Sequence, residues 1–155
     1  NGDNRIIPDI IKSFETKKTL KIRNPNSTRP WQYILDVVFI LYSLLNKIKN
    51  KSHFFKTFNI SSNSKTINVK KIVLEFNKQF KFNYKIFNKS NFEKKYLNLN
   101  NGKIFKEFKL KNKFSPTTSI YEVIKYYNEL FKNKKKIKEI VNKQIEDYER
   151  NSKNL

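Results

Sequence analysis

The residue types that this sequence lacks already exclude several kinds of site. Its 155 residues contain no cysteine, no methionine, one histidine and only two glycines, Gly2 and Gly102. Without cysteine there can be no disulfide, no thiolate metal ligand and no cysteine nucleophile. With a single histidine as well, a zinc site of the usual ligand sets is not expected. Two isolated glycines cannot form either of the common glycine-rich phosphate-binding loops.

The sequence also has no alanine and only four arginines, and it opens with Asn1 instead of methionine. Lysine, asparagine, isoleucine and phenylalanine, which have AT-rich codons, are abundant in their place. The missing initiator methionine leads us to expect a piece of a longer polypeptide.

Charge of one sign is abundant, because 34 Lys+Arg against 13 Asp+Glu leave a net charge of +21. A charge this high is typical of nucleic-acid-binding proteins, which gather Lys and Arg on one face. Here lysine is scattered through nearly every segment and arginine is rare. We interpret the charge as solvated surface lysine, with a polyanion site or steering of a phosphorylated substrate as the alternatives.

The longest apolar run extends from Ile34 to Leu45 and is interrupted by Asp36 and Ser43. A bilayer requires about 20 apolar residues, so we expect no membrane span and interpret the run as a buried, central helix. No targeting segment is visible, and the absence of cysteine fits a cytoplasmic location.

Hydrophobic periodicity predicts an α/β chain of helices and short strands. Asp36 is predicted to cap the start of the helix that follows it, and Thr117, Thr118 or Ser119 to open a later one. The expected helices lie near 6–17, 34–48, 69–80, 101–108, 117–131 and 135–148, and the expected strands near 20–23, 58–60 and 82–87.

The most distinctive segment reads RNPNSTRPWQYILD and occupies residues 23–36. It resembles a signature of the extended short-chain dehydrogenases that act on nucleotide sugars, and within them the CDP-glucose 4,6-dehydratase branch. Residues 4–9 (NRIIPD) and 144–149 (QIEDYE) are similar to two further stretches of that branch, in the expected order.

The resemblance implies that residues 1–155 are a single C-terminal, nucleotide-sugar-binding region, with the N-terminal Rossmann sheet largely absent. The function it implies is a share in the NAD-dependent dehydration of CDP-glucose to CDP-4-dehydro-6-deoxyglucose. NAD and the catalytic residues would belong to the missing Rossmann part, so we expect these residues to be inactive alone. The full-length enzyme can form a homo-oligomer.

Five residues are the candidate substrate contacts under this resemblance. Arg29 carries a fork of charged donors that suits a diphosphate, and Pro25 and Pro30 stiffen its loop. The alternative for Arg29 is a surface or intrachain ion pair. Trp31 offers a flat face for core packing or for a base, and Tyr33 is either a pocket residue or a core tyrosine.

The other two candidates are Arg5, as a phosphate or ribose contact, and Glu93, as a ribose contact. Tyr121 and Lys125 match the Tyr-x-x-x-Lys pair of the superfamily, but a chain rich in both residues produces that match by chance. We interpret Tyr121 as non-catalytic and His53 as a surface residue.

Two other classes of function compete with this one. A basic nucleic-acid-binding module would bind in a salt-sensitive way that survives loss of Arg29. A non-catalytic interaction domain would be a stable fold without any upstream half. We expect neither a specific nucleic-acid partner nor a membrane partner.

Overall fold

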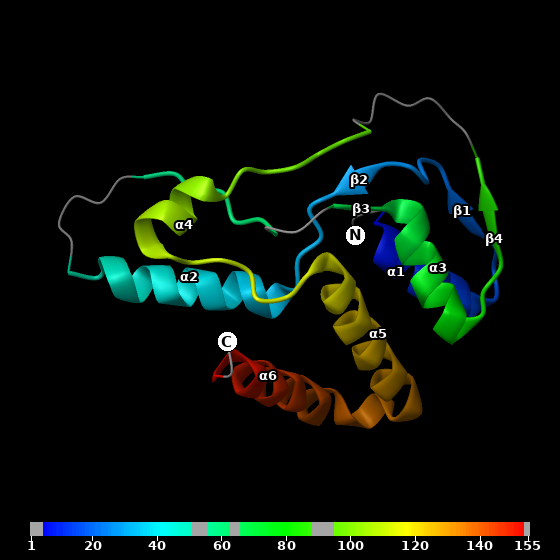
Figure 1. Cartoon of the computed structure of the whole chain (residues 1–155). Helices are drawn as coiled ribbons and strands as arrows, with labels where there is room; N and C mark the ends of the chain where they lie inside the picture. The colour runs from blue at the N-terminus through cyan, green and yellow to red at the C-terminus, as the bar shows by residue number, and fades with distance from the viewer. Residues whose placement is uncertain (1–4, 51–55, 63–65, 88–94, 154–155) are drawn as a thin grey trace. The chain divides into compact units, whose positions relative to one another are not determined.

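The computed structural model of the chain describes residues 5–50, 56–62, 66–87 and 95–153. They belong to two compact units (Figure 1). Unit 1 consists of residues 1–29 and 66–98, and unit 2 of residues 30–65 and 99–155. The described residues are mostly helical, with short strands in unit 1, which agrees with the predicted α/β class in its coarse form.

Unit 1 packs two helices beside short strands. Its elements are α1 (Ile6–Thr16), β1 (Leu20–Ile22), β2 (Thr28–Arg29), β3 (Ile67–Asn68), α3 (Val69–Phe80) and β4 (Tyr84–Ile86). Strand β1 pairs in parallel with β4, and β2 pairs antiparallel with β3. Helices α1 and α3 lie side by side in Figure 1 and bury Ile10, Ile72 and Phe76 completely. The apolar faces predicted from periodicity therefore form the core of this unit.

Three helices end on a lysine in the left-handed conformation, where glycine is usually found. Lys17, Lys81 and Lys109 have φ angles of 58°, 50° and 58° and terminate α1, α3 and the helix α4 (Gly102–Phe108). Glycine adopts this conformation without strain because it lacks a Cβ. A chain with so little glycine uses its most abundant residue there instead.

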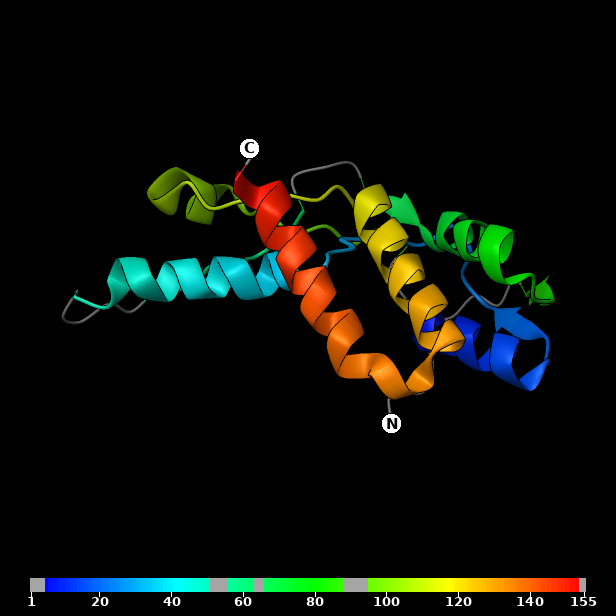
Figure 2. The same ribbon diagram turned by 90° about the horizontal axis from the view of Figure 1, so that it is seen from below.

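Unit 2 contains α2 (Ile34–Ile48), α4 (Gly102–Phe108), α5 (Pro116–Lys132), the 3₁₀ turn η1 (Lys134–Lys136) and α6 (Ile137–Lys153). Helices α5 and α6 form a hairpin joined by η1, as seen from below in Figure 2. One side of α2 packs through Ile40 against a buried cluster of Ile104, Phe108 and Leu110.

Most predicted elements are confirmed, and several details are wrong. Residues 58–60 form no strand, and the strands β2 and β3 were not predicted. Helix α5 is capped by Ser115, whose Oγ accepts from the Thr118 N–H, and Pro116 occupies its first turn. Helix α2 is not central, because much of its apolar surface is exposed.

Within the described ranges no helix is both long and apolar enough to cross a membrane. The same residues contain no group of three or more His, Asp or Glu side chains placed to hold a metal ion.

Candidate functional site

The candidate site begins with the backbone that carries Arg29. In β2, Thr28 pairs with Asn68 and Arg29 pairs with Ile67 of β3. On its other side Thr28 forms a parallel bridge with Tyr96. The Thr28 N–H donates to the Lys95 carbonyl (2.8 Å) and the Leu97 N–H donates to the Thr28 carbonyl (3.3 Å). Because hydrogen bonds hold this short strand on both sides, the Cα of Arg29 has a fixed position.

The loop before Arg29 is fastened to the first turn of α3. Its carbonyls accept from α3 amides, Pro25 from Lys70 (2.8 Å) and Ser27 from Val69 (3.0 Å). The Asn68 side chain accepts from the next amide, that of Lys71, at 2.9 Å. A helix leaves its first N–H groups without intrahelical partners. Here these donors serve to hold the Arg29 loop, so they are not available to a phosphate group.

The two candidate arginines of unit 1 differ in exposure. Arg29 is half-buried, and its Nη1 donates to the Thr28 carbonyl at 2.8 Å. Arg5 is exposed at the start of α1, where its carbonyl accepts from the Asp9 N–H at 3.0 Å. The backbone therefore orients Arg29 more firmly than it orients Arg5.

Asp36 does not cap α2, which corrects the prediction made for it. It is the third residue of the helix, is 1% exposed, and its carboxylate accepts four hydrogen bonds from distant residues. Oδ1 accepts from the Lys113 N–H (2.8 Å) and the Tyr148 hydroxyl (2.7 Å), and Oδ2 accepts from the Phe114 N–H (3.2 Å) and the Asn112 side-chain amide (3.5 Å). This carboxylate joins α2 to α6 and to the segment before α5.

Tyr33 lies in the core of unit 2, next to the Asp36 carboxylate network. It is 4% exposed and its ring stacks on Phe114, with centroids 5.5 Å apart, and packs near Tyr148 at 6.1 Å. Burial, together with the negative charges of Glu122, Asp36 and Asp147, raises the pKa of Tyr33 to about 12. This environment favours the core-tyrosine alternative, and a ligand contact by Tyr33 stays a prediction.

The structure does not distinguish between the alternatives for the remaining candidates. Trp31 is half-buried, which fits both of its alternatives. Glu93 and His53 lie outside the described residues.

In α5, Tyr121 is 54% exposed, while the Lys125 ammonium lies 3.0 Å from Asp147 of α6. The hydrogen bond to Asp147 is the main cause that raises the Lys125 pKa. Lys125 thus has a structural partner, which fits the interpretation of Tyr121 as non-catalytic.

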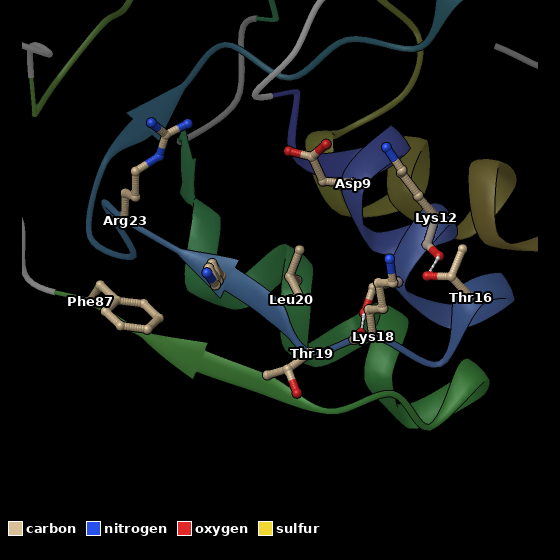
Figure 3. Close-up of a pocket in the computed structure, with 10 residues that line it drawn as sticks. Asp9, Lys12, Thr16, Lys18, Thr19, Leu20, Arg23 and Phe87 are labelled. Carbon is tan, nitrogen blue, oxygen red and sulfur yellow. Dashed lines mark hydrogen bonds between the residues drawn. The ribbon is translucent and has the colours of Figure 1, made fainter.

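A separate open hollow of about 510 Å³ lies in unit 1 between α1 and β1 (Figure 3). Asp9 and Lys12 border it from α1, and Arg23 borders it from the end of β1. Lys18 and Lys21 add positive charge, so cations outnumber the single acidic side chain around it. Neither Arg5 nor Arg29 lines this hollow.

Sequence reasoning did not single out Asn68 or the lining of this hollow. Asparagine directly before an amphipathic run is the usual signal of a helix N-cap, and residues 68–80 carry it. The hollow has no such signal, because its lysines are indistinguishable in the sequence from the many solvated ones.

No family model matches the chain. Over 32 residues, which are 21% of this chain and 9% of the relative, it is 56% identical to CDP-glucose 4,6-dehydratase from Salmonella typhimurium. The chain is homologous in part to CDP-glucose 4,6-dehydratase. The predicted resemblance to that dehydratase is therefore confirmed as a partial one.

Solved structures show how much of a dehydratase-like fold is present. The chain superimposes with a TM-score of 0.62 on dTDP-glucose 4,6-dehydratase from Bacillus anthracis in complex with NAD, at 18% identity, covering 88% of this chain and 42% of that one. With UDP-glucuronic acid 4-epimerase from Bacillus cereus, in complex with UDP-glucuronic acid and NAD, the TM-score is 0.63 at 15% identity. That match covers 82% of this chain and 40% of the epimerase. The fold is thus that of part of the extended epimerase/dehydratase structures, and the chain spans less than half of their length.

Proposed function

We propose that the chain is the nucleotide-sugar-binding part of an NAD-dependent sugar-nucleotide 4,6-dehydratase that acts on CDP-glucose. The observation that carries the proposal is the 56% identity over 32 residues to CDP-glucose 4,6-dehydratase. The fold shared with a dehydratase and an epimerase supports it, because both of these solved structures are extended epimerase/dehydratase structures. The proposed setting is the cytoplasm, in an enzyme that can be a homo-oligomer, with no specific nucleic-acid or membrane partner.

The residues described here do not fit NAD itself. Dinucleotide sites use a glycine-rich turn that opens a helix, with the pyrophosphate on free N–H groups. The turn that opens α3 contains no glycine, and the amides of Val69, Lys70 and Lys71 already donate to Ser27, Pro25 and Asn68. We assign NAD and the redox chemistry to a Rossmann part that is supplied elsewhere, and we expect these 155 residues alone not to turn over CDP-glucose.

The part we propose for this chain is to hold the phosphate end of the substrate. Arg29 is the diphosphate-binding residue, since a guanidinium matches two phosphate oxygens at once and its strand is held on both sides. Arg5, Trp31, Tyr33 and Glu93 are further proposed contacts. Holding the half of the substrate that does not react orients the sugar for the chemistry elsewhere.

Calorimetric titration of CDP-glucose into the chain tests this proposal. We expect Arg29→Ala to weaken binding about tenfold or more, the loss typical of a charge-assisted hydrogen-bond pair. Arg23→Ala is the matched control, because it removes the same charge six residues before Arg29. The Arg23 side chain borders the hollow of unit 1. Equal weakening by both variants, or no preference for CDP-glucose over inorganic diphosphate, would contradict the proposal.

A second candidate, general polyanion binding, rests on the cationic hollow lined by Lys12, Lys18, Lys21 and Arg23. It predicts DNA binding that weakens steeply with salt, is lowered by Arg23→Ala and is unchanged by Arg29→Ala. The two arginine variants therefore separate the two functions in opposite directions. An interaction domain without ligand would bind neither CDP-glucose nor DNA.

A further inference from the structure

Strand β2 is held between two neighbouring segments of unit 1, and this arrangement decides which side chains lie beside Arg29. On one side β2 pairs with β3, and on the other side Thr28 bridges in parallel to Tyr96. Paired residues point to the same face of a sheet, and successive residues of a strand point to opposite faces. Tyr96 therefore shares the face of Thr28, and the next residue, Leu97, shares the face of Arg29.

The neighbours of Arg29 on its own face of the sheet are aliphatic. Arg29 is the partner of Ile67 in β3, and Leu97 occupies the same face on the opposite side of β2. Side chains of adjacent strands on one face have Cβ atoms about 5 Å apart. The Arg29 side chain therefore leaves the sheet between two apolar side chains, whereas the other face carries the polar Thr28 and Asn68.

A shared hydrogen-bond acceptor places the guanidinium on the Leu97 side of Arg29. The Thr28 carbonyl accepts from the Leu97 N–H at 3.3 Å, so this carbonyl points toward the segment that contains Leu97. The Arg29 Nη1 donates to the same oxygen at 2.8 Å. The guanidinium and the Leu97 backbone therefore meet at one acceptor, and Leu97, more than Ile67, is the neighbour of the charged group.

We propose that Leu97 is a positioning residue for diphosphate binding by Arg29, an inference that rests on the proposed function. An aliphatic side chain beside a guanidinium restricts the rotamers of the arginine, so less conformational entropy is lost on binding. It also keeps water away from one edge of the group. Charge interactions are stronger where water is excluded, and salt screens them less. Leu97 thus raises the affinity for a sugar-nucleotide diphosphate by acting through Arg29.

The first experiment compares substitutions of Leu97 by calorimetric titration of CDP-glucose into the chain. Leu97→Ala should weaken binding about threefold to tenfold and make the affinity fall more steeply with sodium chloride, because water reaches the guanidinium. Leu97→Met keeps an apolar side chain of similar volume and should bind within about twofold of the wild type. Tyr96→Ala, one residue earlier on the opposite face, is the matched control and should leave the salt dependence unchanged. Wild-type binding by Leu97→Ala, or equal weakening by Leu97→Met, overturns the inference.

A double-mutant cycle separates action through Arg29 from a general loss of structure. In the Arg29→Ala background, Leu97→Ala should change the affinity for CDP-glucose by less than about twofold, because the group that Leu97 positions is gone. The circular dichroism spectra of the single and double variants should match that of the wild type. Losses of affinity that add in the double variant would show that Leu97 acts independently of Arg29, and they would overturn the inference.

The same titrations keep this inference apart from the proposed function. If Arg29→Ala weakens CDP-glucose binding and Leu97→Ala does not, the diphosphate role of Arg29 stands and only the positioning role of Leu97 is refuted. If CDP-glucose binds and Arg29→Ala has no effect, the diphosphate role of Arg29 fails and the positioning role fails with it. A wild-type chain that does not bind CDP-glucose overturns both.

Discussion

At the scale of single residues, the Asp36 carboxylate connects several segments of unit 2 through four hydrogen bonds. Its donors are 76 to 112 positions away in the sequence, on the segment before α5 and on α6. A buried carboxylate is costly unless donors satisfy its oxygens, and then it specifies which segments meet. Asp36 therefore has a structural role, although it lies in the most distinctive segment of the sequence.

Replacing Asp36 tests this role directly. We expect Asp36→Ala to lower the free energy of unfolding by about 3–5 kcal/mol, because it leaves several buried donors without an acceptor. Tyr148→Phe removes only one of these hydrogen bonds and should cost about 1.5–3 kcal/mol. Urea unfolding followed by the fluorescence of Trp31, the single tryptophan, measures both. Equal effects of the two variants would mean that the backbone donors contribute nothing.

The two buried tyrosines predict a loss of stability at high pH. Burial raises the pKa of Tyr33 from 10.0 to about 12, and burial and the Asp36 hydrogen bond raise the pKa of Tyr148 even further. Folding therefore favours the protonated phenols. Their stabilising contribution is complete below pH 10, the range of an unfolded tyrosine, and is lost progressively as the pH rises toward the folded-state pKa.

Absorbance at 295 nm against pH checks this prediction. Of the eight tyrosines, we expect Tyr33 to ionise at about pH 12 and Tyr148 at a still higher pH or on unfolding. The double variant Tyr33→Phe/Tyr148→Phe should remove that late step. Titration of all tyrosines near pH 10 in folded protein would contradict the prediction.

At the scale of elements, the start of α3 connects local helix chemistry to the candidate site. Asn68 caps α3 with its side chain and pairs with Thr28 through its backbone, next to Arg29. We expect Asn68→Ala to lower the free energy of unfolding of unit 1 by about 1 kcal/mol, the usual cost of a lost N-cap. Far-UV circular dichroism in urea measures this cost.

Ser115→Ala is the parallel change in unit 2, since Ser115 caps α5 through Thr118. It should cost a similar amount, about 1 kcal/mol, and Trp31 fluorescence follows it. If only Asn68→Ala also weakened CDP-glucose binding, the cap would matter to the site through the Arg29 loop. Weakening by Ser115→Ala as well would show a general effect of lost stability.

The elements also show which parts of the fold can be predicted from the sequence. The helices with strong 3.6-residue periodicity, such as α1 and α3, were predicted within one or two residues because each carries its own apolar face. Strands β2 and β3 are two residues long, too short for alternation to be seen, and exist only because distant segments pair. Residues 58–60 alternate like a strand, but Phe58 and Ile60 pack against the buried cluster of Ile40, Ile104, Phe108 and Leu110 instead.

For the candidate site, too, the sequence predicts local features and misses the long-range contacts. The loop before Arg29 turns at Pro25, where the Ser27 N–H donates to the Asn24 carbonyl at 3.2 Å, and a ligand contact by Arg29 stays a prediction. The contacts of Asp36 and Tyr33 depend on residues more than 70 positions away, which no local pattern contains. Local signals thus identified the segment, and long-range packing decided which of its side chains are buried.

At the scale of the whole molecule, the net charge of +21 sets how stability depends on salt. Repulsion among the excess lysines opposes the compact state, and salt screens it, with a Debye length of about 10 Å at 0.1 M. Exposed ion pairs such as Lys132–Glu129 act in the opposite sense, because salt weakens them. Each exposed pair contributes about 0–1 kcal/mol, and thirteen acidic residues cannot compensate thirty-four basic ones.

Repulsion should therefore dominate, and the urea midpoint should rise when sodium chloride is increased from about 0.02 M to about 0.5 M. Chloride is the suitable anion, because sulfate would also strengthen apolar burial and confuse the two effects. A midpoint that falls with salt would mean that specific ion pairs outweigh the general repulsion. A midpoint that rises as much with 1 mM DNA phosphate as with 0.5 M chloride would instead indicate a bound polyanion and favour the cationic hollow of unit 1 as a functional site.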